Sequence, residues 1–281
     1  LSIGDRLWRW MLIAWSFLFL LLGPVYYHLL VPVIIVLWAF DSQASGTGGM
    51  LKNLAVVLLA SAWAGISRVN WFPVPGMLAA SLYFLEQPVG KRNFLIYLWK
   101  PAAWTLAGTL VAFGAQALYA MVSGNPTGQF TSSLTSDLLW YRLLPNPTYP
   151  MGILLGSLVV SVPLVLLVFL RLNGHWSAYH PIRLLGLGAV VGVLYAGGLV
   201  VSTKIGGGSN LHNLDAYFTL LWVVSAAIFF RRFIADRPLE TASSLHGWML
   251  VSAIALALLV PAYYIVTFGG PYSLPSPAEA Q

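Results

Sequence analysis

Nine long apolar segments dominate this amino-acid sequence, and short polar stretches separate them. Each segment is close to the ~20 residues that cross the hydrocarbon core of a bilayer, or somewhat shorter. A chain in lipid satisfies its backbone polar groups internally only as helices or a closed barrel. The segments lack the period-two alternation of barrel strands, so we predict an all-α, polytopic transmembrane helical bundle. The segments are 10–22, 25–40, 52–67, 71–85, 101–122, 149–170, 184–202, 211–230 and 246–268.

Composition supports a lipid environment. Of the 281 residues, 59% are hydrophobic and 8% are charged, whereas a soluble domain has about 25% charged residues. The net charge is +6, but the basic residues stand singly between apolar segments, so we expect no nucleic-acid partner. We interpret residues 1–268 as one transmembrane domain and 269–281 as a flexible extracytoplasmic tail.

Some predicted segments are short or broken. Gly23-Pro24 divides the first two segments, because proline removes a backbone donor. Segments 52–67 and 71–85 are separated only by Arg68-Val69-Asn70, which is typical of a broken or re-entrant pair. Elsewhere, Gly188-x-x-x-Gly192 and Gly152-x-x-x-Gly156 predict close contact between helices.

The basic residues divide into two sets when the nine segments alternate in direction. Eleven fall on the side that includes the N-terminus, which the positive-inside rule makes cytoplasmic. They are Arg6, Arg9, Lys52, Lys91, Arg92, Lys100, Arg171, Arg183, Arg231, Arg232 and Arg237. Arg68, Arg142 and Lys204 fall on the outer side, against the rule, so each needs another reason to be there.

The polar stretch from Ser202 to Asp215 is the most unusual connection in the chain. Glycine N–H groups in such a loop form an anion-binding nest, and Lys204 adds a positive charge. A flexible hairpin with a snorkelling lysine is the plainer interpretation, and both stay open. The candidate anion-binding residues here are Lys204, Gly206, Gly207 and Gly208, with Asn210 and His212 as neutral partners.

Two other outer connections contain candidate residues. In the longest loop, about 122–148, Asp137 or Ser136 is expected to cap a short helix that places Trp140 at the headgroup level. In the functional alternative, Asp137 and Arg142 face a cavity. Tyr27 and His28, between the first two segments, belong either to an aromatic belt or to a polar pocket.

The sequence predicts no metal site. Helix-borne histidine ligands need i, i+3 or i, i+4 spacing, and none of the five histidines has such a neighbour. Nucleotide-binding and hydrolase motifs are missing as well.

Two stretches resemble the later half of GT-C superfamily membrane glycosyltransferases, in the branch of bacterial protein O-mannosyltransferases and aminoarabinose transferases. They are Ala-Gly-Ile-Ser-Arg-Val-Asn-Trp-Phe-Pro, from Ala64 to Pro73, and Ser-Thr-Lys-Ile-Gly-Gly-Gly-Ser-Asn, from Ser202 to Asn210, with a long loop between them. The resemblance implies a bacterial cytoplasmic membrane and a polyprenyl-phosphate sugar donor. Basic residues at the extracytoplasmic face would bind the donor phosphate.

The chain departs from that family in its acidic residues. The resemblance implies an acidic motif in the first outer loop, but the acids before Asp137 are Asp5, Asp41 and Glu86, all assigned to the cytoplasmic side. Asp137 is therefore the candidate general base within these residues. A divalent cation is expected only if an acidic loop lies upstream of Leu1, in which case this chain is the C-terminal part of a longer enzyme.

Two other interpretations stay open. The chain fits a non-catalytic integral subunit that stabilises a larger membrane complex through other membrane subunits. It fits a transporter less well, because the apolar segments lack the ionisable residues of a coupling pathway.

Overall fold

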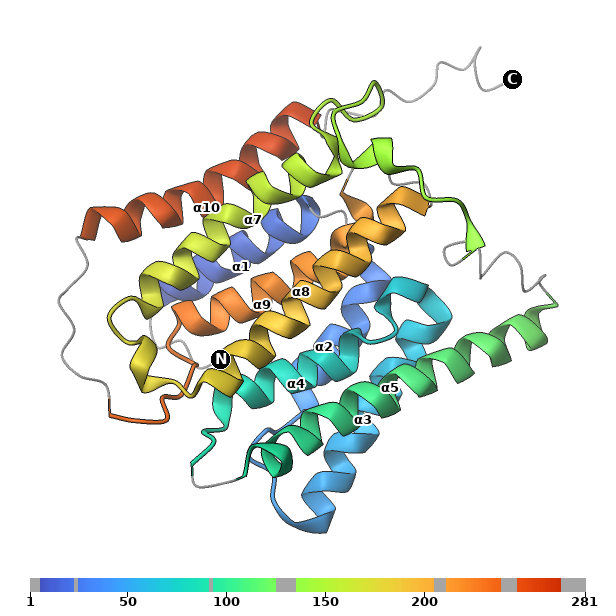
Figure 1. Ribbon diagram of the computed structural model, residues 1–281, viewed down its shortest axis with the longest axis vertical. Helices are drawn as coiled ribbons and strands as arrows, with labels where there is room; N and C mark the ends of the chain where they lie inside the picture. The colour runs from blue at the N-terminus through green and yellow to red at the C-terminus, as the bar shows by residue number, and fades with distance from the viewer. Residues whose placement is uncertain are drawn as a thin grey trace.

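A computed structural model describes residues 6–22, 25–90, 93–124, 135–204, 211–238 and 247–268. Throughout these residues the regular structure is helical, apart from an isolated bridge between Asn146 and Tyr149 (Figure 1). The α-helices are α1 (Arg6–Leu22), α2 (Leu30–Ala39), α3 (Gly46–Ser67), α4 (Val74–Glu86), α5 (Phe94–Ser123), α7 (Gly152–Leu172), α8 (Pro181–Lys204), α9 (Asp215–Phe229) and α10 (Gly247–Phe268). Short 3-10 helices lie at Tyr27–Leu29 (η1), Val69–Trp71 (η2), Trp140–Leu143 (η3), Trp176–Ala178 (η4) and His212–Leu214 (η5).

Each of the nine predicted apolar segments overlaps one of these α-helices, which confirms the all-α prediction for the described residues. Within the same residues, α3, α5, α7 and α8 are long and apolar enough to cross a membrane. Other helices are shorter: α4 has 13 residues and α9 has 15. At 1.5 Å per residue, 15 residues reach about 22 Å, less than the ~30 Å hydrocarbon core. Nine membrane crossings therefore stay a prediction.

The two short helices α4 and α9 form the centre of the bundle. Ten of the 13 residues of α4 and 12 of the 15 residues of α9 are buried. In Figure 1 they lie between α3 and α5 on one side and α7 and α10 on the other. The longer helices therefore shield them, and a short helix is tolerated because it is covered by protein.

Helices α3, α4 and α5 approach each other closely at glycines. A Cβ on Gly65 of α3 would lie 2.2 Å from the carbonyl oxygen of Ala112 in α5, and one on Gly76 of α4 would lie 2.6 Å from the Trp104 oxygen. Small residues allow this backbone contact, which drives association where lipid replaces water. Gly188 and Gly192, in contrast, face open space, so the predicted contact there is wrong.

The connections between helices gather at two ends of the bundle. At the first, which we call the Arg68 end, Leu139 N donates to Thr203 O at 2.8 Å, and Trp63 Nε1 donates to His28 O at 2.9 Å. Arg68 also bonds to residues of η5 at this end. Connections α1–α2, α3–α4, α5–α7 and α8–α9 therefore lie together.

The second end, which we call the Arg183 end, holds the remaining connections. Arg183 at the start of α8 is fully buried and donates to Phe84 O and Leu85 O of α4 at 2.7 and 2.8 Å. It also donates to Ile234 O and to Asp236 Oδ2, both at 2.7 Å. Arg183 thereby satisfies the last carbonyls of α4, which have no partner inside their own helix.

The basic residues follow the same division. Among the described residues, the Arg68 end holds Arg68, Arg142 and Lys204, and every other lysine and arginine lies toward the Arg183 end. The two loop sets expected from alternation therefore lie at opposite ends of the bundle.

Candidate functional site at the Arg68 end

Arg68 lies at the junction of α3 and η2, where the chain turns into α4. Its backbone is extended, with φ −164° and ψ 134°, so α3 ends at Ser67. Its guanidinium reaches η5 and α9: Nη1 donates to Asp215 Oδ2 at 2.8 Å, and Nη2 donates to Asn213 Oδ1 at 2.7 Å. Arg68 Nη1 also approaches the carbonyl oxygen of His212 at 3.3 Å.

Asp215 is the fully buried partner of this ion pair. Its other oxygen, Oδ1, accepts from Asn70 Nδ2 at 2.9 Å and from Ala216 N at 2.8 Å. As the first residue of α9, it is also stabilised by the positive end of the helix dipole. Both carboxylate oxygens accept hydrogen bonds, so the role of Asp215 is structural: it holds Arg68 and Asn70 at the start of α9.

The ion pair gives a reason for one of the three cations that oppose the positive-inside rule. The Arg68 side chain is 17% exposed, and the Asp215 carboxylate neutralises its charge. Arg68 therefore holds the end of α3 against η5 and the first residue of α9.

Arg142 and Lys204 lie together at the C-terminal turn of α8. Lys204 is the last residue of that helix and is half-buried. The hydrogen bond from Leu139 to Thr203 places η3, which contains Arg142, against the same turn. Cations are favoured here because helix C-termini carry negative partial charge. Arg142 Nη1 is buried and has no hydrogen-bond partner in the part of the chain that the structure describes.

The aromatic group beside Arg68 is Tyr26. The Arg68 guanidinium lies 5.4 Å from the centre of the Tyr26 ring, and Tyr26 stacks on His28 at 5.7 Å. The predicted residue Tyr27 is 86% exposed and points away. The aromatic residue that contacts Arg68 is therefore Tyr26, which was not among the predicted residues, although the Tyr-Tyr-His group indicated aromatic residues at this end.

Asp137 is exposed in the loop that precedes η3. The expected cap by Asp137 or Ser136 is wrong, because η3 begins at Trp140 with Leu139 as its N-cap residue and no side-chain cap. Trp140 itself is 60% exposed, as an interfacial anchor would be.

Four predicted binding residues, Gly206, Gly207, Gly208 and Asn210, lie outside the described residues. His212 is half-buried in η5, and its carbonyl oxygen faces Arg68. Within the described ranges, no group of three or more His, Cys, Asp or Glu residues is placed to hold a metal ion.

The structure thus defines a class: an all-helical protein with four helices able to cross a membrane and a polar, cation-bearing end. Comparisons of the chain with protein-family models, with curated proteins and with solved structures gave no match.

Proposed function

We propose that this chain is a multi-pass membrane protein that binds a polyprenyl-phosphate-linked sugar at its Arg68 end, as GT-C glycosyltransferases do. In this proposal the nine apolar segments cross or enter a bacterial cytoplasmic membrane, and the N-terminus is cytoplasmic. The Arg68 end then faces the extracytoplasmic side.

The observation that carries the proposal is the buried Nη1 of Arg142, a half-buried residue whose η3 packs against α8. Its Nη1 makes no hydrogen bond to any described residue, and an unpartnered buried charge is costly. A phosphate would supply acceptors for the planar fork of arginine, and Lys204 would add a second positive charge. Charge-assisted hydrogen bonds of this kind contribute about 1.5–3 kcal/mol each.

Arg68 acts as a positioning residue in this proposal. It holds Asn213 and Asp215, which fixes the chain immediately after the glycine loop 206–208. The glycine N–H groups, with Asn210 and His212, then complete the phosphate site. Tyr26, which precedes η1, and His28 within it border the site, with Tyr27 exposed beside them.

The general base is Asp137 if this chain is catalytic on its own. Asp215 is excluded from that role, because Arg68, Asn70 and the Ala216 N–H occupy both of its oxygens. A base must reach the acceptor hydroxyl by a hydrogen bond, and Asp137 is exposed at the same end. If an upstream region supplies the carboxylate instead, the chain binds donor without transferring sugar.

The test uses purified protein in neutral-lipid nanodiscs with a short-chain polyprenyl phosphate and, for comparison, the matching polyprenol. We expect tighter binding of the phosphate than of the alcohol. Arg142→Gln should weaken phosphate binding at least tenfold, since one lost charge-assisted bond is about 1.5 kcal/mol or more. Arg237→Gln, which changes an exposed arginine at the opposite end, is the matched control. Equal affinity for phosphate and alcohol, or an Arg142→Gln variant that binds as tightly as wild type, would refute the proposal.

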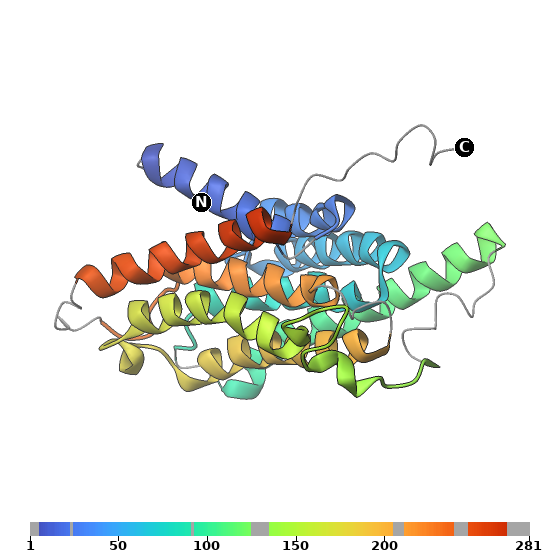
Figure 2. The same ribbon diagram turned by 90° about the horizontal axis from the view of Figure 1, so that it is seen from above.

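A second candidate function is a non-catalytic integral subunit, and the length of α5 favours it. At 30 residues α5 is about 45 Å long, beyond the ~30 Å hydrocarbon core. Its C-terminal end extends past the other helices in Figures 1 and 2, and Met121 and Val122 there are each 80% exposed. A partner helix would cover this apolar end. The native mass of the protein extracted from its own membrane tests this: a defined complex that Val122→Lys dissociates would support the subunit.

A further inference from the structure

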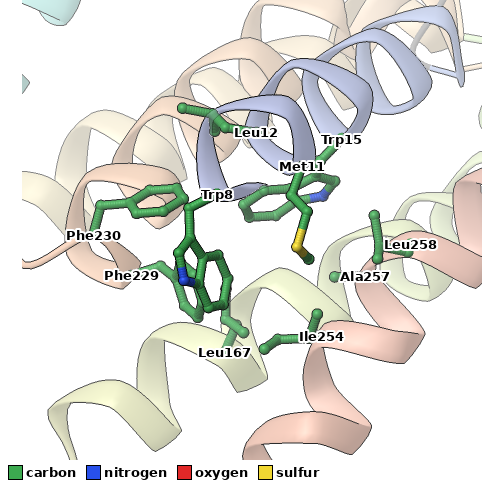
Figure 3. Close-up of a pocket in the computed structure, with 10 residues that line it drawn as sticks. All are labelled: Trp8, Met11, Leu12, Trp15, Leu167, Phe229, Phe230, Ile254, Ala257 and Leu258. Carbon is green, nitrogen blue, oxygen red and sulfur yellow. The ribbon is translucent and has the colours of Figure 1, made fainter. Parts of the chain in front are cut away.

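A partly open apolar cavity lies between four helices at the Arg183 end, far from the site described above. The cavity itself has a volume of about 30 Å³, and the rest of the hollow is its open mouth (Figure 3). Helices α1, α7, α9 and α10 each contribute to it. The lining residues used below are Trp8, Trp15, Leu167, Phe230 and Ala257.

Two arginines lie next to lining residues along the chain, although neither lines the cavity itself. Arg171 follows Leu167 by one turn on the same face of α7, and Arg231 directly follows Phe230. The two positive charges are close enough to repel each other. Neither arginine forms an ion pair within the described residues. Asp236, an acidic residue at the same end, is paired with Arg183 instead. Two unmatched like charges at the end of an apolar cavity favour an anionic amphiphile.

Arg231 occupies a backbone position that suits glycine. Its φ is +58°, and it is the only non-glycine residue with positive φ among those described. It closes α9 as the left-handed residue of a Schellman-like end, with Arg232 N donating to Ala227 O at 2.7 Å. Glycine is the usual residue here because a side chain is strained in this conformation. Arg231 places a charged side chain at a backbone position where any side chain is strained, which indicates a use for the charge.

The cavity wall also contains an unused donor. Trp15 is 7% exposed, and its indole N–H has no hydrogen-bond partner in the described part of the chain. Buried donors are normally satisfied, so each exception calls for an explanation. This nitrogen has less than 1 Å² of accessible surface, so a ligand atom reaches it only if the wall moves.

From these observations we infer that the cavity binds an anionic phospholipid. One acyl chain enters the mouth of the cavity beside the partly buried Trp8 and Phe230, and the phosphate lies on Arg171 and Arg231. Basic pockets between membrane helices are a known form of headgroup recognition, and both the charge and the apolar lining match this occupant. This site is independent of the function proposed for the Arg68 end.

The test measures binding of phosphatidylglycerol and phosphatidylcholine to the full chain in detergent, by native mass spectrometry and by the shift in melting temperature. We expect phosphatidylglycerol to bind at least tenfold more tightly than phosphatidylcholine. Arg171→Gln and Arg231→Gly should each remove most of this preference. Arg231→Gly is decisive, because glycine suits φ +58° and the lipid-free melting temperature should not fall. Loss of lipid preference in this variant then reports the charge rather than the fold.

Two further variants separate the parts of the site. Ala257→Phe fills the cavity and keeps both arginines, so it should weaken binding of the acyl chain. Arg237→Gln, an exposed arginine of the same end, should bind phosphatidylglycerol as wild type does. Equal binding of the two lipids, or unchanged preference in both arginine variants, would overturn the inference. So would a dimer in native mass spectra that Ala257→Phe abolishes, because a second copy would then occupy the cavity.

Discussion

Arg68 Nη1 lies 2.8 Å from Asp215 Oδ2, and this ion pair joins the end of α3 to the first residue of α9. The two residues are 147 positions apart, so the contact fixes the tertiary arrangement of the site end. Because Asp215 is fully buried, its charge depends on Arg68, on Asn70 and on its own helix terminus. The pair is therefore expected to matter more for structure than a surface ion pair would.

Removal of one partner should be strongly destabilising. Arg68→Gln leaves the Asp215 carboxylate buried without its counter-charge, which costs about 3–5 kcal/mol. Adding Asp215→Asn to Arg68→Gln removes the orphaned charge and should recover part of the loss. Thermal unfolding in detergent measures both effects, with Arg142→Gln as a control that breaks no ion pair. Equal melting temperatures for wild type and Arg68→Gln would contradict this role.

Backbone contact between α3 and α5 predicts opposite effects for two glycine substitutions. Gly65→Ala places a methyl group 2.2 Å from the Ala112 oxygen, so α3 and α5 must separate, at a cost of about 1–3 kcal/mol or more. Gly114→Ala, in α5 itself, meets nothing within 4 Å and should stabilise the helix by up to about 1 kcal/mol. Melting temperatures of the two variants test the contact. A tolerated Gly65→Ala would show that the helices are not packed backbone to backbone.

The positions of the helices were predictable because each α-helix overlaps a long apolar segment of the sequence. Contacts between helices were not predictable in the same way. Gly188 and Gly192 have the spacing of a helix-packing motif but face open space. Gly152 and Gly156 have the same spacing and do pack closely, but against Leu144 and Tyr149 of the preceding connection rather than another helix. Gly65 and Gly76 make close helix contacts without that spacing. Which face of a helix meets another depends on the tertiary arrangement, and a motif of two residues carries no information about it.

At the candidate site, too, the sequence predicted which residues lie at one end but not which residues they contact. The division of the chain into two ends follows from counting segments, so Arg68, Arg142 and Lys204 were correctly expected at one end. The role of Arg68 was not visible, because its partner Asp215 lies 147 residues away. Similarly, Arg183 has the sequence context of an ordinary cytoplasmic-side arginine, and only the fold shows that it binds the last carbonyls of α4.

The ion pair between Arg183 and Asp236 predicts acid sensitivity. Burial acts to raise the pKa of Asp236, but hydrogen bonds from His180 N, Arg183 and Val89 N outweigh it and lower the pKa below its ordinary value. The stabilisation from a lowered carboxyl pKa is complete above the unfolded pKa, about 3.9. It is lost as the pH falls through the lower, folded pKa. The melting temperature should therefore drop below about pH 4.

Asp236→Asn isolates this effect. The variant should melt at a lower temperature at pH 7, since fully buried Arg183 loses its counter-ion, and its melting temperature should change less between pH 5 and pH 3. Asp137→Asn, at an exposed aspartate, serves as the control. A pH profile of Asp236→Asn parallel to that of wild type would assign the acid sensitivity to another group.

The orientation of the two ends in the membrane can be measured directly, because the chain has no cysteine and a single introduced one is the only labelling site. Thr148 and Asn173 are exposed in connections at the Arg68 end and the Arg183 end, respectively. The eleven basic residues predicted for the Arg183 side make it cytoplasmic. A membrane-impermeant maleimide should therefore label Thr148→Cys in intact cells and Asn173→Cys only after permeabilisation. Labelling of both after permeabilisation confirms that both positions are accessible. The reverse pattern in intact cells would place Arg142 and Lys204 in the cytoplasm, and an extracytoplasmic donor site at the Arg68 end would then be excluded.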